Sequence, residues 1–462
     1  MAEGKKSAKT SGWTSSKVRE QLRTFLSDAS LAPGGVGAIA FRPSMPATIM
    51  SSEAKGEAVE QIRAYLEERE FPSWLAHSLA CQFCHQASKG LIPSVVGECD
   101  DPTSGAADGE QSGGCFEHKK DGKAFSQLVL SAFLDYCRSL VDGGQEVDAE
   151  LAKLAGRHGA WKEWPLSVAS SRNSRRKMED RHVVMPTLTA LDHLSRLDSA
   201  QRHGLFAVFD GHAGVETANY AAAHFPLLYL SQLTKATVQS DPESLTPSVI
   251  SDCLKNAFSQ TDKKLIAKAS TERMRSGCTA VAAALRRAAG GSAGSLSVAW
   301  LGDSQAALVE VSAEAGGPVC RMLTSPHSLS DEKEYRRVEE AGGVVMNVNG
   351  ELRVNALLNV CRSLGDVYAK PCISGDADSS EQELRGTELV LVLACDGVFD
   401  AMTPDDLLET VRHFVVKKEP KDYGSMADDI LRTAKENGAT DNLTAVVVYL
   451  HEPQAVWKRL RS

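Results

Sequence analysis

Hydrophobic and polar residues follow two different patterns along this chain, and the change comes near residue 160. Over residues 17–160, apolar residues recur every three or four positions, which predicts amphipathic helices. The clearest stripe runs from Phe125 to Leu140. The glycine-, serine- and aspartate-rich stretch 98–122 predicts a disordered loop, and the small, polar residues 1–16 predict a disordered tail. We therefore expect a helical N-terminal region in which no chemistry is visible.

From residue 162 onward, short apolar runs alternate with helical patterns. The runs have the length and composition of buried strands. They lie near 180–186, 205–210, 279–286, 295–301, 306–312, 388–395 and 443–450. Helical spacing predicts helices near 214–230, 247–270, 331–341, 404–417 and 424–437. Short turns between strands favour antiparallel pairing over a Rossmann-type sheet, so we expect an α/β unit with mainly antiparallel sheets.

The runs near 295–301 and 306–312 are close enough in sequence to predict how they pair. In SLSVAWLGDSQAALVEV, two apolar runs are separated only by Gly302, Asp303 and Ser304. Two strand-like runs joined by such a short, glycine-containing segment predict a β-hairpin.

Several apolar runs end in an acidic residue. Asp210, Asp303 and Asp396 each follow such a run, and an ionised carboxylate at the end of a buried strand is costly unless it is paired or binds a metal. A single Asp-Gly pair is ordinary turn chemistry. The recurrence of the pattern, with Arg175 and His212 close by in sequence, suggests convergence on one site. Oxygen ligands without a neighbouring His or Cys cluster suit Mg²⁺ or Mn²⁺ rather than zinc or iron.

Composition narrows the classes of function. The chain has 462 residues, 42% of them hydrophobic and 24% charged, with a net charge of −9, which argues against nucleic acid as the main partner. No apolar stretch has the roughly 18–20 residues that span a bilayer, and the N-terminus lacks the apolar core of a signal peptide. We expect no membrane partner and a cytoplasmic protein, with the nucleus as a second compartment. The eleven cysteines are then mostly reduced thiols.

The motifs RRKMEDRH, FDGHAG, SGCTA, LGDSQ, RSLGD, ACDGVFD and TDN follow one another in this order. In their order and spacing they resemble the metal-dependent protein serine/threonine phosphatases, the PPM or type 2C family, over residues 162–455. Within that family the chain is similar to the calcium/calmodulin-dependent kinase phosphatases, a branch that includes the partner-of-PIX phosphatases and the nematode feminisation phosphatase. The segments SRNSRRKMEDRHV, DEKEYRRVEEAGG and GELRVNALLNVCRSLGDV carry this second resemblance.

The resemblance implies a fold, a reaction and a set of ligands. The fold is a sandwich of two mainly antiparallel sheets flanked by helices, and the reaction is hydrolysis of phosphoserine and phosphothreonine on proteins by a water activated between two divalent ions. The implied metal ligands are Asp210, which bridges the two ions, with the Gly211 carbonyl and Glu179 at one ion and Asp396 and Asp441 at the other. Asp303 and Asp400 fit a weaker third ion that shares Asp396, and Asp180 holds metal-bound water.

The same resemblance assigns the two catalytic side chains. Arg175 matches the arginine that binds phosphate, and His212 matches the general acid that protonates the leaving serine or threonine oxygen. Substrates are phosphoproteins, which could include protein kinases, and the N-terminal region could bind regulatory proteins. Arg362 resembles a family arginine near the site, although a salt bridge with Asp366 is an equal alternative. Ala356 stands where relatives usually have glycine, which should stiffen the segment around it.

Two alternatives remain open. One is an adaptor whose phosphatase fold is catalytically weak and whose helical region docks partners; a lost ligand would favour it, and Glu179, Asp210, Asp396 and Asp441 are all present. The other concerns CQFCH at 81–85, which could bind zinc together with Cys99, Cys115 and His118 but is better explained as part of a packed helix.

Overall fold

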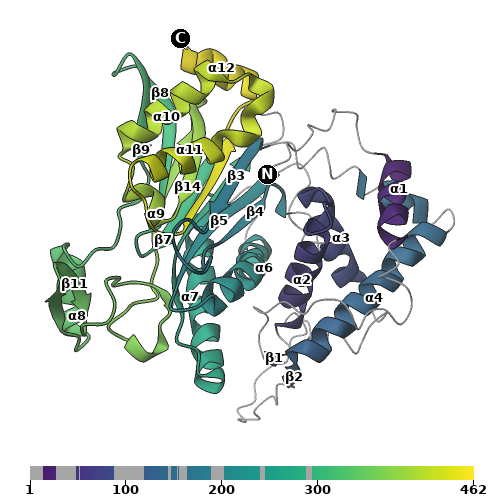
Figure 1. The fold of residues 1–462 in the computed structure, drawn as a ribbon, viewed down its shortest axis with the longest axis horizontal. Coiled ribbons are helices and arrows are strands. Elements are labelled where there is room, and N and C mark those ends of the chain that lie inside the picture. The colour runs from purple at the N-terminus through teal and green to yellow at the C-terminus, as the bar shows by residue number, and fades with distance from the viewer. Residues whose placement is uncertain are drawn as a thin grey trace. The chain divides into compact units, whose positions relative to one another are not determined.

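The computed structural model divides the chain into two compact units, Met1–Lys162 and Glu163–Ser462 (Figure 1). It describes residues 14–27, 48–50, 53–87, 119–143, 147–152, 154–155, 164–188, 202–239, 245–287 and 294–461. None of the helices in these ranges combines the length and apolarity needed to cross a membrane.

The first unit is built mainly of helices. Its helices include α1 (Ser15–Leu26), α2 (Ala54–Glu67), α3 (Ser73–Gln86) and α4 (Gly122–Asp142). Two short strands, β1 (Thr48–Met50) and β2 (Lys119–Asp121), pair antiparallel. The stripe predicted from Phe125 to Leu140 lies on α4, where most of its apolar side chains are buried.

The expected tail and loop of this unit differ from the structure at their ends. Helix α1 begins at Ser15, because the Thr14 side chain accepts a hydrogen bond from the backbone N–H of Lys17 and caps the helix. Residues 15 and 16 are therefore helical, and residues 1–13 lie outside the described chain. Strand β2 and the start of α4 likewise take up 119–122, and the remainder of the expected loop, 98–118, also lies outside it.

Several aromatic rings pack against one another in the core of the first unit. Phe25 meets the rings of Tyr65 and Phe71 edge-on, and Phe83 meets Phe133 in the same way; such arrangements are favoured beyond the burial of their area. Cys81 and Cys84 are buried on α3, as the packed-helix explanation requires. The other residues of the zinc alternative, Cys99, Cys115 and His118, lie outside the described residues.

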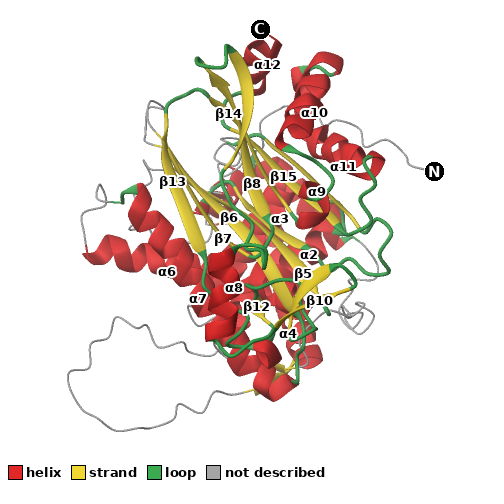
Figure 2. Ribbon diagram, turned by 90° about the vertical axis from the view of Figure 1, so that its left-hand side faces the viewer, coloured by secondary structure: helices red, strands yellow, loops and turns green. Residues whose placement is uncertain are grey.

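The second unit is a sandwich of two antiparallel sheets (Figure 2). The first sheet has the order β13-β7-β6-β5-β4, with β12 paired to β6, and the second has the order β3-β15-β14-β8-β9. The strands of the first are β4 (Arg181–Met185), β5 (Arg202–His212), β6 (Gly277–Arg287), β7 (Gly294–Leu301), β12 (Leu364–Gly365) and β13 (Asp378–Leu384). Those of the second are β3 (Leu166–Ser171), β8 (Gln305–Ser312), β9 (Gly317–Met322), β14 (Glu388–Ala394) and β15 (Leu443–Tyr449).

Helices cover the outer faces of both sheets, which confirms the expected α/β sandwich. Helices α6 (Glu216–Gln239) and α7 (Pro247–Glu272) pack on the first sheet. Helices α10 (Pro404–Lys417) and α11 (Met426–Glu436) pack on the second. The remaining helices here are α9 (Asp396–Phe399), α12 (Pro453–Arg461) and the 3₁₀ turn η7 (Pro420–Ser425). Between the sheets lies one core of fully buried aliphatic and aromatic side chains from β5, β6, β14 and β15, the burial that stabilises the sandwich most.

The hairpin predicted around Gly302 is wrong. Strand β7 pairs with β6 and β13 in the first sheet, whereas β8 pairs with β14 and β9 in the second. Nearly every residue of β7 and the first half of β8 is buried, so these runs gain more from facing the inter-sheet core than from pairing with each other. Gly302, with φ of +88°, makes the sharp corner from one sheet to the other.

A small lobe, residues 328–374, extends from the sandwich. It contains α8 (Glu332–Glu340), the antiparallel pair β10 (Val345–Val348) and β11 (Glu351–Val354), β12 and the 3₁₀ turn η6 (Val367–Ala369). The lobe has its own apolar cluster, which includes Val338, Val354 and Ile373. We call residues 328–374 the lobe.

Candidate active site

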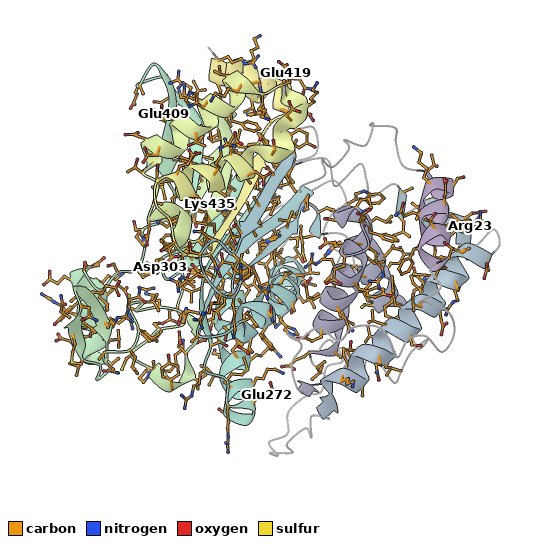
Figure 3. The ribbon with its side chains drawn as sticks, in the orientation of Figure 1. Arg23, Glu272, Asp303, Glu409, Glu419 and Lys435 are labelled. Carbon is orange, nitrogen blue, oxygen red and sulfur yellow. The ribbon has the colours of Figure 1, made fainter. Side chains whose placement is uncertain are left out.

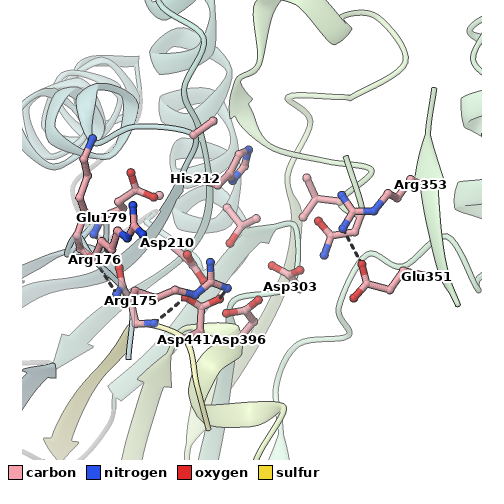
Figure 4. A pocket seen from close by; sticks show the side chains of 17 residues that line it. Arg175, Arg176, Glu179, Asp210, His212, Asp303, Glu351, Arg353, Asp396 and Asp441 are labelled. Carbon is pink, nitrogen blue, oxygen red and sulfur yellow. Dashed lines mark hydrogen bonds and ion pairs between the residues drawn. The ribbon is translucent and has the colours of Figure 1, made fainter. Parts of the chain in front are cut away.

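A cavity of about 600 Å³ opens where the two sheets and the lobe meet. Figure 4 shows the side chains that line it. They are Arg175, Arg176, Lys177, Glu179, Asp210, Gly211, His212, Ala213, Thr279, Asp303, Glu351, Arg353, Asn359, Val360, Asp396, Asp441 and Asn442. Of the residues predicted for the site, Asp180 and Asp400 alone are not among those that line this cavity.

Five carboxylates from both sheets form the floor of this cavity. Asp210 ends β5 in the first sheet, whereas Asp396 follows β14 and Asp441 precedes β15 in the second. Glu179 lies in the segment between β3 and β4, and Asp303 in the corner between β7 and β8. The cavity therefore brings together acidic residues spread over more than half of the chain.

The corner that carries Asp303 is held from the side by His327. The Nδ1 atom of His327 accepts a hydrogen bond from the backbone N–H of Gly302 at 3.1 Å, and the backbone N–H of His327 donates to the Gly302 carbonyl at 2.8 Å. Since both backbone groups of Gly302 are bound, the position of the next residue, Asp303, is fixed.

The crowding of the carboxylates is reflected in their pKa values. Burial, and then the nearby charges of Asp396 and Asp180, raise the pKa of Asp210 well above its ordinary value. Burial and the charge of Asp396 raise the pKa of Asp303 to about 7. Oxygen atoms of Asp210 and Asp396 lie within 4.8 Å of each other. Like charges so close repel each other, and divalent cations would relieve that repulsion. Hard oxygen donors of this kind fit Mg²⁺ or Mn²⁺.

Asp180 lies next to this floor rather than on it. It is buried, and its Oδ2 accepts a hydrogen bond from the Thr444 hydroxyl at 2.7 Å. Its Oδ1 is buried without a hydrogen-bond partner among the described residues. Burial raises the pKa of Asp180 to about 6, although the hydrogen bond from the Thr444 hydroxyl acts in the opposite direction. An unpaired buried acceptor beside the floor is consistent with a carboxylate that binds water at a metal site.

Asp400 lies one turn further along, at the end of α9, and its side chain is exposed. Partial desolvation and the charges of Asp396 and Asp441 raise its pKa to about 6. Asp400 therefore interacts electrostatically with the floor, but it does not line the cavity as Asp303 does.

Cys395 also lies within reach of Asp210 and Asp396. Its thiol is occupied, since it donates to the Asn442 carbonyl at 3.5 Å and accepts from the Thr444 N–H at 3.2 Å. Burial raises the pKa of this thiol well above its ordinary value. A neutral thiol is a poor ligand for Mg²⁺ or Mn²⁺, so Cys395 packs beneath the floor.

Arg175 stands at the edge of the floor. Its Nη2 donates to Asp441 Oδ2 at 2.5 Å, and its side chain is 59% exposed. A guanidinium that is held at one end by a carboxylate and open at the other can still bind the oxygens of a phosphate group.

His212 is paired with a buried carboxylate that the sequence did not assign to the site. The Nε2 atom of His212 lies 2.7 Å from Asp366 Oδ2, and Asp366 is fully buried. Burial lowers the pKa of His212, but the hydrogen bond and charge of Asp366 and the charges of Asp303 and Glu179 outweigh it, so the pKa is raised. Gly277 permits this pair, because a Cβ there would lie 2.1 Å from Asp366 Oδ2.

Neither expectation for Arg362 describes its contacts. Arg362 is buried and pairs with Glu334 and, at 3.0 Å, with Asp378. Asp366 instead accepts hydrogen bonds from His212 and the Ser363 hydroxyl. Arg362 thus links the lobe to β13 and does not reach the cavity.

The TDN motif contributes a second functional residue, Asn442, whose role sequence reasoning missed. Its Oδ1 accepts from the backbone N–H of Glu179 at 2.8 Å. Its Nδ2 donates to the carbonyls of Arg172 at 3.0 Å and Lys177 at 2.9 Å. Asn442 is buried. Its three hydrogen bonds tie the 172–179 segment to the part of the chain that carries Asp441. Arg175 and Glu179, which both line the cavity, are thereby positioned together.

Comparisons with known proteins agree with this geometry. The family model described as Protein phosphatase 2C matches residues 164–443. Human protein phosphatase 1F is 34% identical over 413 residues, which cover 88% of this chain and 82% of the relative. Protein phosphatase fem-2 of Caenorhabditis elegans is 33% identical over 301 residues, covering 65% of this chain and 62% of that one. The match with mouse protein phosphatase 1E spans only 35% of that relative.

Solved structures extend the likeness to the fold of almost the whole chain. The structure titled as that of a C. elegans sex determining protein matches with a TM-score of 0.74 and 26% identity, and covers 96% of this chain and 97% of that one. A serine-threonine phosphatase 2C from Toxoplasma gondii shares the fold, with a TM-score of 0.52 over 62% of this chain and 94% of its own. The resemblance inferred from the motifs is confirmed: the chain belongs to the protein phosphatase 2C family of serine/threonine protein phosphatases.

Proposed function

We propose that this protein hydrolyses phosphoserine and phosphothreonine on proteins and depends on Mg²⁺ or Mn²⁺ to do so. The observation that carries the proposal is the convergence of five carboxylates, Arg175 and His212 on one cavity. Asp210, Glu179 and the Gly211 carbonyl would hold one cation, and Asp210, Asp396 and Asp441 the other. Asp303 would contribute to a weaker third site, with Asp400 at its edge. Bound cations would supply Lewis acidity that lowers the pKa of an attacking water and neutralises charge on the phosphoryl group.

Side chains of the protein bind the phosphate group and protonate the leaving oxygen. Arg175 binds the phosphate oxygens and orients the group, since phosphoryl transfer needs mainly positioning and charge stabilisation. His212 donates a proton to the serine or threonine oxygen as it leaves. Asp366 holds one nitrogen of that ring, which leaves the other for the substrate.

The alternative of an inert adaptor has less support. Loss of an acidic residue from the floor would favour it, but Glu179, Asp210, Asp396 and Asp441 all line the cavity. We also propose that protein kinases are among the phosphoprotein substrates and that the unit Met1–Lys162 binds regulatory proteins. Affinity capture with the full chain, and with residues 1–162 removed as a control, would identify such partners.

Metal dependence gives the direct test of the activity. The purified chain should release phosphate from a phosphothreonine peptide with Mn²⁺ or Mg²⁺ and lose that activity with EDTA. Equal activity in EDTA would contradict the proposal. The Asp210→Ala variant should lose almost all turnover while keeping its circular dichroism spectrum, because it lacks the carboxylate shared between the cations.

A further inference from the structure

Four basic side chains line the cavity above the acidic floor: Arg175, Arg176, Lys177 and Arg353. The first three are consecutive residues of the 172–179 segment, and Arg353 lies on the lobe. Figure 4 shows Arg175 and Arg176 on one side of the acidic residues and Arg353 on the other. The protein as a whole carries a net charge of −9, so this concentration of cations is a local exception to its charge.

Two of these four cations already have carboxylate partners. Arg175 is paired with Asp441 at 2.5 Å, and Arg353 Nη2 is paired with Glu351 at 2.7 Å. Arg353 Nη1 also donates to the Leu357 carbonyl at 2.9 Å. The charge of each is therefore largely compensated within the protein.

Arg176 and Lys177 differ from the other two. Both side chains are exposed, and among the described residues neither makes an ion pair with a carboxylate. Their backbone is nevertheless fixed, because the Lys177 carbonyl accepts from Asn442 at 2.9 Å and the Arg176 carbonyl accepts from Arg172 at 3.3 Å. Two uncompensated cations are thus presented at the cavity mouth from a restrained segment.

Their spacing from Arg175 limits what they can reach. Arg176 and Lys177 directly follow the phosphate-binding arginine in a bent segment, and all three side chains line the same cavity. A substrate whose phosphate lies at Arg175 therefore brings the side chains next to its phosphoresidue close to these cations.

We propose that Arg176 and Lys177 form a specificity subsite for acidic residues that flank the phosphoserine or phosphothreonine of the substrate. This inference rests on the proposed function, since it takes the phosphate to bind at Arg175. Carboxylate side chains that flank the phosphoresidue would pair with the two free cations, whereas basic side chains there would be repelled. Each exposed pair of this kind contributes little, so the subsite selects among substrates without changing the reaction.

The experiment uses the full chain and three phosphothreonine peptides of equal length, with glutamates before the phosphoresidue, glutamates after it, or neutral residues on both sides. The wild type should show a value of kcat/KM about three- to tenfold higher for at least one glutamate peptide than for the neutral one, and the difference should lie mainly in KM. The preference should shrink as the salt concentration rises, because exposed charges are screened.

The charge-reversal variant Arg176→Glu with Lys177→Glu should abolish or invert that preference, and the single alanine variants should each reduce it. The matched control is Arg412→Glu with Lys417→Glu, which changes the net charge equally. Both of these residues are exposed on α10, the helix of Glu409, which lies well away from Asp303 (Figure 3). The control should keep the wild-type preference. A wild type without preference for either glutamate peptide, or the same preference in the Arg176/Lys177 variant, would overturn the proposal.

A second readout separates this proposal from the proposed function. The same peptides with a non-hydrolysable phosphonate in place of the phosphate are labelled with fluorescein, and their Kd is measured by anisotropy in Mg²⁺. Tighter binding of a glutamate peptide that depends on Arg176 and Lys177 supports the subsite even where no peptide is hydrolysed. Hydrolysis of all three phosphopeptides with equal kcat/KM and equal Kd supports the activity and contradicts the subsite.

Discussion

The side-chain oxygen of Asn442 accepts a hydrogen bond from the backbone N–H of Glu179 at 2.8 Å. With the two bonds that its amide donates to the Arg172 and Lys177 carbonyls, this contact joins two segments 263 residues apart. The floor of the cavity is complete only while these segments stay together.

Replacement of Asn442 by alanine should lower kcat/KM by about tenfold to a hundredfold, because misplacement of catalytic groups by as little as 1 Å can cost that much. The measurement is steady-state hydrolysis of a phosphothreonine peptide at saturating Mn²⁺. Asn437→Ala is the control, since Asn437 donates a similar bond, to the Ala401 carbonyl, but does not line the cavity. Comparable kcat/KM values for the two variants would show that Asn442 does not position the site.

Arg175→Ala should weaken transition-state binding by about 2–4 kcal/mol, the cost of removing one positioned charge contact. Arg175→Lys should recover only part of the loss, because an ammonium cannot bind two phosphate oxygens in the planar geometry of a guanidinium. Arg432→Ala is a suitable control, since Arg432 is exposed to a similar extent, 60%, and also pairs with an aspartate. An unchanged kcat/KM in Arg175→Ala would place this residue outside the site.

Asp366→Asn removes the charge that faces His212 while keeping nearly the same shape. We expect kcat for phosphopeptides to fall by about tenfold to a hundredfold, because general-acid catalysis contributes on that scale or above it. Hydrolysis of p-nitrophenyl phosphate should fall less, since its leaving group does not need a proton. Equal losses on both substrates would argue against a role through His212, and Asp376→Asn, on an exposed residue nearby, should affect neither.

The contacts of Glu334 give the stability of the lobe a defined pH dependence. Burial alone would raise the pKa of Glu334, but the hydrogen bonds and charges of Arg362 and Arg337 lower it to about 2. The folded pKa lies below the unfolded one, so the stabilisation is fully present above about pH 5 and is lost as the pH falls toward 2. A shift of this size corresponds to about 3 kcal/mol.

The Glu334→Gln variant should therefore unfold at a lower temperature than the wild type at pH 7, with a difference that narrows steadily toward pH 3. Thermal unfolding followed by circular dichroism over this range measures the difference. A difference that is independent of pH would mean that the charge of Glu334 is not what stabilises the lobe.

Ala356 has a left-handed backbone, with φ of +60°, a conformation that costs a residue with a Cβ about 1 kcal/mol or more. Ala356→Gly relieves this strain but adds freedom to the unfolded chain, so we expect almost no change in Tm. Ala315→Gly, at an exposed turn position without positive φ, should lower Tm instead. A clear loss of stability in Ala356→Gly would contradict the strain argument.

Much of the phosphatase unit could be predicted from the sequence, because its central strands are apolar on both faces and stand out as short runs. Strands β5, β6, β14 and β15 and helices α6, α7 and α10 lie where the patterns placed them. The strand β13 was missed because DSSEQEL is polar and lies at the edge of its sheet. Periodicity also could not show that β7 and β8 belong to different sheets, since a buried run looks the same in either.

Some residues of the candidate site could be predicted from the sequence and others could not. Its acidic residues could be predicted, because several of them follow apolar runs and the ordered motifs identify them as one set of ligands. Asp366 lies in the RSLGD motif, where the sequence suggests only a salt bridge with the nearby Arg362, because no local pattern shows which of two distant groups a buried carboxylate meets. Arg353 and Glu351 carry no sequence signal, since they reach the cavity only through the fold of the lobe.

The corner at Gly302 makes a single continuous run of chain belong to both layers of the sandwich. Because acidic groups from each layer line the cavity, a cation bound there would be thermodynamically linked to the integrity of the whole phosphatase unit. Ligands that bind only the native state raise its melting temperature in proportion to the logarithm of their concentration. Titration with Mn²⁺ should accordingly delay denaturation of both layers in one transition.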